Sequence, residues 1–218
     1  MEWTPLRGGD PLPHESLSET ATVVDRALAV HGYELDAAID AIDDATPGYG
    51  GLFDPNTDRR EVRAACETVI DAGPNPVAKR EAHPEVVLYV DGSSRGNPGP
   101  AGAGAVVQID GETRAALGRP VGARADNNVA EFAALQLGLR AVGAYDPATL
   151  EVRIDSMTVI DAVWRDGSGE SFAPYSDAVA ELLAGVPAHR WTHLVDSDPN
   201  PADSRATVGA DIAAIGPG

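Results

Sequence analysis

Residues 86–104 read VVLYVDGSSRGNPGPAGAG, and they decide how the rest of the chain is interpreted. The first five residues form a continuous apolar, β-branched run, which predicts a buried strand, and this run ends in an acid, Asp91. A loop rich in glycine and proline follows, and Ala103–Ile109 predicts a second strand. A phosphate-binding loop of the nucleotide type is excluded by context, because no Gly-Lys-Ser/Thr follows and no helix begins after the loop.

The pattern outward from this stretch predicts an α/β domain over residues 85–218. Asp110-Gly111, between Ala103–Ile109 and Thr113–Arg119, is a strong hairpin signal. The order β-β-β-α-β-α-α-β-α implies a mixed five-stranded sheet with helices on both faces. Asn127 or Asn128 is expected to cap a helix that runs to about Tyr145. The later elements are expected as a strand over Leu150–Asp155, a short helix over Met157–Trp164, a helix near Tyr175–Ala184, a strand near Arg190–Val195 and a last helix from about Pro201.

The N-terminal part of the chain has a different pattern. Residues 1–15, with three prolines and two adjacent glycines, predict an irregular tail, and residues 73–84 predict a linker. Between them, residues 16–72 show apolar residues at helical spacing in three segments, which predicts a small three-helix domain. Asp58 and Glu61 form a capping box at the start of the third segment.

The charge of the chain restricts its partners. The 34 acids outnumber the 16 bases, which gives a net charge of −18, and Lys79 is the only lysine. Such a composition is typical of a proteome adapted to high internal salt, where the Debye length shrinks to about 3 Å. Negative charge disfavours a nucleic-acid partner, since binding normally depends on a basic face. A nucleic-acid function must therefore be supported by motifs.

The sequence shows neither a targeting segment nor the pair of cysteines that an internal disulfide needs. No run approaches the roughly 18 apolar residues of a membrane span, and the first residues lack a signal segment. We therefore expect a cytoplasmic, monomeric protein with no membrane partner. The single cysteine, Cys66, lies on an apolar helical stripe and is expected to be a buried core residue.

Three acids stand where the apolar pattern predicts none. Asp91 follows a buried strand, Glu131 shares a helical face with Leu135, and Asp155 ends another strand. Taken singly, such residues are more often helix caps or partners of a helix dipole. Taken together, buried carboxylates need a cation, because an unpaired buried charge is costly. With no histidine or arginine close to all three, Mg²⁺ or Mn²⁺ is the simplest partner.

The residues around these acids resemble the motifs of type 1 ribonuclease H. The segment from Tyr89 to Gly104 is similar to the first-strand signature of that family. Asn127-Asn128-Val-Ala-Glu131 resembles its Asn-Asn-x-x-Glu helix start, Ile154-Asp155-Ser156 its third acidic motif, and Asn200-Pro-Ala-Asp203 its Asn-x-x-Ala-Asp element. The resemblance covers residues 85–218 and, with the acidic composition, implies an archaeal, halophilic member that carries an N-terminal extension.

The resemblance implies an endonuclease that hydrolyses the RNA strand of RNA-DNA hybrids and leaves 5′-phosphate and 3′-hydroxyl ends. Two divalent ions, Mg²⁺ or Mn²⁺, would be held by four acids: Asp91, Glu131, Asp155 and Asp203. His193 and Asp196 are the nearest candidates for the proton-transfer residue of the family, although His193 fits equally well as a hydrogen-bonded sheet residue. Asp198 and Asp211 are alternatives for the fourth acid.

The resemblance also implies a set of contacts with the hybrid. Asn97, Asn127 and Asn128 would read bases and 2′-hydroxyl groups, which distinguish RNA from DNA. Further contacts are expected from the first loop, at Gly92, Ser93, Arg95 and Gly96.

The chain departs from the family in three places. Asp126 stands where a neutral hydroxyl donor is expected, and the loop 165–171 is short and nearly without bases. Residues 1–84 carry 16 acids and 7 bases, unlike a basic hybrid-binding module, so the partner of the N-terminal unit is unknown.

Two other functions fit the same fold. The chain could be a nucleic-acid-binding scaffold with a weakened metal site, against which the retention of all four acids argues. It could also be another metal-dependent nuclease, but the three asparagines favour a reader of 2′-hydroxyl groups.

Overall fold

A computed structural model of the chain describes residues 14–48, 50–73, 82, 85–164, 173–195 and 197–216. The predicted N-terminal tail, the predicted linker, the loop 165–171 and Asp196 lie wholly or almost wholly outside these residues. Among the residues that the structure describes, no helix is long and apolar enough to span a bilayer.

The five strands form one mixed sheet, as the sequence predicts. They are β1 (Glu85–Ser94), β2 (Gly99–Ile109), β3 (Glu112–Ala125), β4 (Thr149–Ile154) and β5 (His189–His193). Their order in the sheet is β3-β2-β1-β4-β5. The pairs β1–β2 and β2–β3 are antiparallel, whereas β1–β4 and β4–β5 are parallel. Asp110 (φ 54°) and Gly111 (φ 77°) are both left-handed, which the predicted two-residue hairpin requires.

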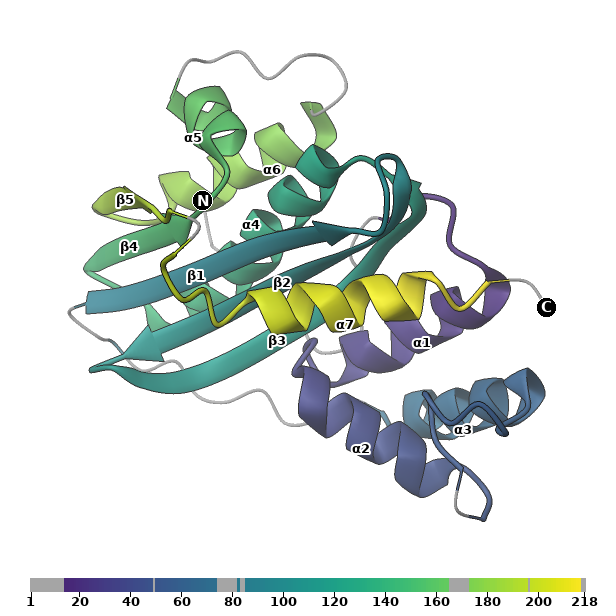
Figure 1. The fold of residues 1–218 in the computed structure, drawn as a ribbon. Helices are drawn as coiled ribbons and strands as arrows, with labels where there is room; N and C mark the ends of the chain where they lie inside the picture. Colours follow the sequence, from purple (N-terminus) through teal and green to yellow (C-terminus); the bar gives the residue numbers. More distant parts are fainter. Residues whose placement is uncertain are drawn as a thin grey trace.

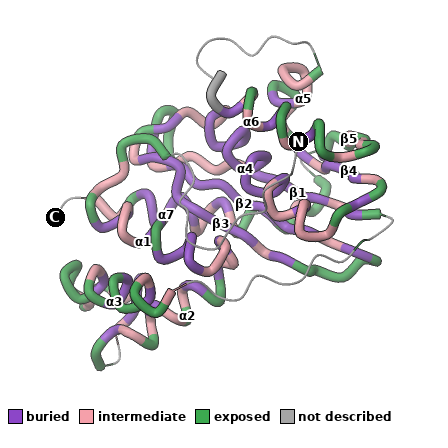
Figure 2. The backbone as a smooth tube through the Cα atoms, turned by 180° about the vertical axis from the view of Figure 1, so that it is seen from behind, coloured by how far each residue is buried: buried purple, intermediate pink, exposed green. Residues whose placement is uncertain are grey.

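Helices cover both faces of the sheet (Figure 1). One face carries α4 (Asn127–Val142), α5 (Met157–Trp164) and α6 (Ala173–Ala184), and the short helix η1 (Gly143–Tyr145) follows α4. The other face carries α7 (Asp203–Ala213), which lies across β2 and β3. Viewed from behind, the buried residues concentrate in the sheet and in α4 (Figure 2).

Close contact between α7 and the sheet depends on glycines in β2. A Cβ atom on Gly102 would collide with the backbone of Gly209 and Ala210 in α7. A Cβ atom on Gly104 would collide with the backbone at Ala202 and Ala206. Since residues two apart in a strand share a face, these glycines make one bare stripe on which the helix backbone rests. The glycine-rich stretch therefore has a packing role beyond its loop.

The N-terminal helices form as predicted. They are α1 (Glu19–Val30), α2 (Leu35–Ala45) and α3 (Arg59–Ala72). The capping box is present, because the Asp58 carboxylate accepts from the Arg60 amide at 2.7 Å and the Glu61 carboxylate from the Asp58 amide at 3.0 Å. Cys66 is buried, and burial raises the pKa of its thiol to about 12, which leaves it an inert core residue.

α1 and α2 pack against β3, α1 also contacts α7, and α3 packs on α1 and α2; their apolar side chains join the same core as those of the sheet (Figure 1). The boundary between a helical domain and a catalytic domain stays a prediction from the sequence.

Candidate active site

The first three acids meet because of the parallel register of β1 and β4. Leu88 lies opposite Val152 and Tyr89 opposite Arg153. Asp91 and Asp155 each come two residues after the last of these pairs, so they lie level at the same edge of the sheet. Glu131 is the fifth residue of α4, which covers this edge.

The structure brings Asp91, Glu131 and Asp155 together as predicted. One carboxylate oxygen from each residue lies within 4.8 Å of the other two. Asp203, the first residue of α7, is outside this group, yet its charge contributes to the raised pKa of Asp91. Asp203 therefore lies close enough to Asp91 for the two charges to interact, and it is exposed.

The electrostatics of the cluster favour a cation. Asp91 is 7% exposed and Glu131 is 4% exposed, whereas Asp155 is exposed. Burial, followed by the charges of Asp155 and Asp203, raises the pKa of Asp91 to about 7. Burial, followed by the charges of Asp91 and Asp155, raises the pKa of Glu131 to about 9. A bound cation would relieve both the desolvation and the repulsion.

The side chains also fit a divalent ion by their chemistry. The Oε2 atom of Glu131 is buried and has no hydrogen-bond partner among the described residues. None of the ion pairs found in the described part of the chain involves Asp91, Glu131 or Asp155. Three carboxylates facing one point are the ligands that hard cations such as Mg²⁺ and Mn²⁺ prefer.

Comparison with known proteins gives the family. The RNase H family model matches residues 83–185. The ribonuclease HI of Halobacterium salinarum is 34% identical over 160 residues, which cover 72% of this chain and 77% of the relative. The chain belongs to the ribonuclease H family.

Solved structures of ribonucleases H share the fold. The N-terminal RNase H domain of Rv2228c from Mycobacterium tuberculosis aligns with a TM-score of 0.57 and 29% identity, over 61% of this chain and 97% of that one. LC11-RNase H1, solved in complex with an RNA/DNA hybrid, aligns with a TM-score of 0.53 and 26% identity, over 59% of this chain and 98% of that one. The family model itself ends before β5 and α7, so His193 and Asp203 lie outside that match.

Gly92 has a structural role in this ribonuclease H. A Cβ atom on Gly92 would lie 2.6 Å from the carbonyl carbon of Ala130 and 2.9 Å from the Cα atom of Glu131. Only a bare backbone lets the start of α4 approach β1 so closely. The amide of Gly92 also hydrogen-bonds to the Glu131 carboxylate and opposes the rise of its pKa. The substrate contact expected of Gly92 stays a prediction.

The start of α4 corrects one expectation. The N-cap is Asp126, whose carboxylate accepts from the Asn128 amide at 2.8 Å, and not Asn127 or Asn128. Aspartate is as good a cap as asparagine, and its charge also complements the helix dipole. The acid that departs from the family pattern therefore has a local structural reason.

Capping by Asp126 leaves the Asn127 side chain available to the site. Its Nδ2 atom lies 3.5 Å from Oε1 of Glu131, and its backbone amide donates to Oδ1 of Asn97 at 3.2 Å. The two asparagine motifs, 30 residues apart, thus adjoin each other beside Glu131.

The other expected substrate residues lie at the end of β1, in the loop that follows it, and at the start of α4. Arg95 forms an ion pair with Asp211 of α7. Ser93 is half-buried, Gly96 has a φ of 92°, and Asn128 is half-buried at the helix start. Their contacts with a hybrid stay predictions.

His193 is the last residue of β5 and pairs with Ile154. Its Nε2 atom lies 3.0 Å from the backbone carbonyl oxygen of Asp155. This position is compatible with both predicted roles, because the ring adjoins Asp155 and is also hydrogen-bonded to the backbone at the end of β4. Asp196, the other candidate, lies outside the described residues.

The two alternatives for the fourth acid are engaged elsewhere. Asp198 accepts from the Val195 amide at 3.1 Å, and Asp211 pairs with Arg95. Asp203 alone of the three contributes to the raised pKa of Asp91. The geometry therefore favours Asp203.

Asn200, the first residue of the Asn-x-x-Ala-Asp element, has a structural role that the sequence did not predict. Its Nδ2 atom donates to the Val90 carbonyl at 3.0 Å, and its Oδ1 atom accepts from the Ala202 amide at 3.1 Å. It ties the turn before α7 to the residue that precedes Asp91. An asparagine three residues before a helix-starting acid is the signal that could have indicated this tether.

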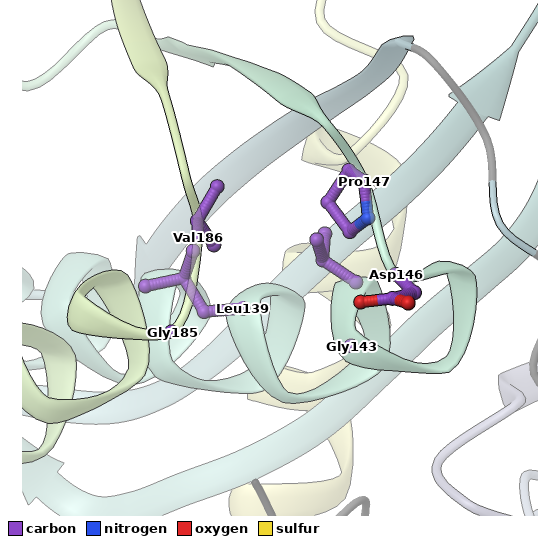
Figure 3. A pocket seen from close by; sticks show the side chains of 7 residues that line it. Leu139, Gly143, Asp146, Pro147, Gly185 and Val186 are labelled. Carbon is purple, nitrogen blue, oxygen red and sulfur yellow. The ribbon is translucent and has the colours of Figure 1, made fainter. Parts of the chain in front are cut away.

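A shallow pocket lies at the opposite end of α4 from Glu131 (Figure 3). Leu139, Pro147 and Val186 supply apolar side chains to its lining, and Asp146 is its one carboxylate. This lining cannot hold a divalent ion in the way that three converging carboxylates can. The acidic cluster remains the candidate active site.

Proposed function

We propose that this ribonuclease H is a type 1 enzyme from a halophilic archaeon that hydrolyses the RNA strand of RNA-DNA hybrids, leaving 5′-phosphate and 3′-hydroxyl ends. The observation that carries the proposal is the approach of the Asp91, Glu131 and Asp155 carboxylates to within 4.8 Å of one another. The complex of LC11-RNase H1 with an RNA/DNA hybrid supports the choice of substrate.

Different residues of the protein would hold the metal ions and contact the substrate. Asp91, Glu131 and Asp155, with Asp203 at the rim, would hold two Mg²⁺ or Mn²⁺ ions. Bound ions would supply an activated water molecule and neutralise the charge that develops on the leaving oxygen. Asn127 orients the Glu131 carboxylate through the contact between Nδ2 and Oε1.

Substrate selection rests on neutral donors beside the acids. Asn97 and Asn127 adjoin each other next to Glu131, and we expect their amides to meet a 2′-hydroxyl group of the RNA strand. Neutral amides discriminate RNA from DNA without adding charge. The negative surface of the protein makes high salt necessary for binding, because salt screens the repulsion of phosphates.

The test compares four labelled substrates in molar KCl: RNA-DNA hybrid, RNA duplex, DNA duplex and single-stranded RNA. We expect cleavage of the hybrid alone, only with Mg²⁺ or Mn²⁺, and its loss with EDTA. Calorimetric titration with Mn²⁺ should show binding that Asp91→Asn removes. Intact hybrid under every metal condition would contradict the proposal and favour a scaffold, while cleavage of RNA duplex would indicate a different nuclease.

A further inference from the structure

We propose that α1 and α2 act as a clamp that positions α7, and with it the Asp203 carboxylate, beside the other acids. The inference rests on the proposed function, since it concerns how the fourth acid is held. It gives the N-terminal helices a part in the active site without contact to the substrate.

The clamp first covers the free edge of the sheet. β3 is an edge strand, and such a strand exposes unpaired backbone groups. The Gly118 amide donates to the Tyr33 carbonyl at 3.1 Å, and the Ala116 amide donates to Oε2 of Glu34 at 3.1 Å. Further along the strand, the Glu15 amide donates to the Val121 carbonyl at 2.7 Å. The N-terminal segment therefore joins the sheet through its backbone.

A buried pair of oppositely charged side chains also lies between α1 and the same strand. Arg119 of β3 is fully buried, and its Nε atom lies 3.7 Å from Oδ1 of Asp25, which is also fully buried. The guanidinium carbon lies 5.4 Å from the centre of the Tyr33 ring. The backbone of Arg119 faces α7, because a Cβ atom on Gly209 would collide with its carbonyl. One residue of β3 thus contacts α1 and α7 together.

The clamp reaches the start of α7 next to Asp203. A Cβ atom on Gly118 would lie 2.8 Å from Cδ2 of Leu35 and 3.0 Å from the carbonyl oxygen of Arg205. Here α2, β3 and α7 meet at one point, two residues after Asp203. The Arg205 guanidinium also forms an ion pair with Asp36 of α2.

The residues just after α7 contact the N-cap of α1 and the first residue of α3. The Ser18 hydroxyl, which caps α1, donates to the Ile215 carbonyl. The Arg59 guanidinium of α3 donates to the Gly216 carbonyl. α1 consequently lies alongside α7 over the outer part of the sheet (Figure 1).

Asp203 is sensitive to the position of α7 for a simple reason. It is exposed, and the N-cap of the helix, Ala202, makes no side-chain capping bond. Asn200 ties the turn before the helix to β1, and beyond that turn the position of the acid relative to Asp91 depends on α7 staying in place. A shift of α7 against β2 or β3 would therefore alter the metal site while leaving the other three acids unchanged.

The experiment compares two variants of the clamp with matched controls in the full chain. Leu35→Ala removes the side chain at the three-way junction, and Asp36→Asn removes the ion pair to Arg205. Val69→Ala deletes buried methyl groups in α3, and Asp40→Asn makes the same charge change as Asp36→Asn on an exposed residue of α2. The readouts are hydrogen exchange of the α7 amides without metal, calorimetric Mn²⁺ binding, and kcat and KM for the hybrid.

We expect Leu35→Ala to raise the Kd of the weaker of the two Mn²⁺ sites about three- to tenfold and to speed hydrogen exchange in the first turn of α7. For Asp36→Asn we expect both effects to be about twofold. Saturating Mn²⁺ should restore kcat, and the KM for the hybrid should stay constant. Both controls should leave α7 exchange and Mn²⁺ affinity unchanged.

The clamp would be overturned if Leu35→Ala and Val69→Ala changed α7 exchange and Mn²⁺ affinity equally. It would also be overturned if Leu35→Ala raised the KM for the hybrid while Mn²⁺ binding stayed unaffected. Exchange in the metal-free protein tests the clamp even if no Mn²⁺ binds, in which case the proposed function fails separately.

Discussion

The two faces of the sheet hold the acids in different ways. On the α4 face, Asp91 and Glu131 are buried and close to Asp155, and the strand register with one glycine fixes their positions. On the α7 face, Asp203 is exposed and depends on a helix that rests on bare backbone. The difference shows that strand register and burial hold three of the acids, whereas the position of the fourth depends on how α7 packs against the sheet.

The largest expected effect concerns the three acids that the strand register and burial hold. Asp91→Asn should reduce hybrid cleavage by at least about 10³-fold, because it removes the carboxylate at the centre of the metal site. Asp203→Asn should cost about 10–100-fold, with partial recovery at high Mn²⁺, since the other acids still bind. Cleavage rates measured across Mn²⁺ concentrations check both expectations. Equal losses of rate in Asp91→Asn and Asp203→Asn would remove the distinction between the two faces.

The glycines allow each face to be disturbed separately. Gly92→Ala should cost about 1–3 kcal/mol of unfolding free energy and abolish tight metal binding, because it drives the start of α4 away from β1. Gly104→Ala should destabilise by a similar amount but displace α7, leaving one metal site intact. Denaturant unfolding and Mn²⁺ calorimetry distinguish them, and two Mn²⁺ ions bound by Gly104→Ala would contradict this expectation.

The sequence predicted what local patterns encode. The Asp110-Gly111 hairpin and the Asp58 capping box are confirmed, because each depends on neighbouring residues. β1 is longer than the apolar run that predicted it. It continues through Asp91 to Ser94, because pairing with β2 extends the ladder past the last apolar residue.

The parts that the sequence did not predict depend on distant residues. The stripe of Gly102 and Gly104 has meaning only once α7, about a hundred residues later, lies on it. The packing of α1 on β3 includes a buried pair, Asp25 and Arg119, which an apolar pattern cannot reveal. The three clustered acids were predictable because each interrupts an apolar pattern, whereas Asp203 was identified from its motif alone.

The buried carboxyl groups of Glu131 and Asp91 also predict that the stability of the metal-free protein depends on pH. Burial and neighbouring charges raise the pKa of Glu131 to about 9 and that of Asp91 to about 7. A carboxyl group with a raised pKa binds its proton more tightly in the folded state, so its contribution to stability is present at low pH and is lost as pH rises.

We therefore expect the unfolding free energy of the metal-free protein to fall between pH 5 and pH 9, by on the order of 2 kcal/mol. The fall should be smaller in Glu131→Gln, and Mn²⁺ should stabilise the native protein most at the alkaline end. Thermal unfolding in EDTA and in Mn²⁺ measures both effects. A flat profile in the native protein, or an unchanged slope in Glu131→Gln, would contradict the raised pKa of Glu131.

The smallest expected effect concerns Asp126, where a structural role and a substrate role can be separated. Asp126→Ser keeps a side-chain oxygen that can cap α4, so the unfolding free energy should change by less than about 0.5 kcal/mol.

The substitution removes one negative charge beside the asparagines that are proposed to meet the hybrid. The KM for the hybrid should therefore fall in low salt and hardly change in molar KCl, where the charge is screened. Asp126→Ala, which loses the cap, should cost about 1 kcal/mol and serves as the control. A KM that falls equally in both salts would mean that the serine hydroxyl contacts the hybrid directly, and that residue 126 belongs to the binding surface rather than only to the helix start.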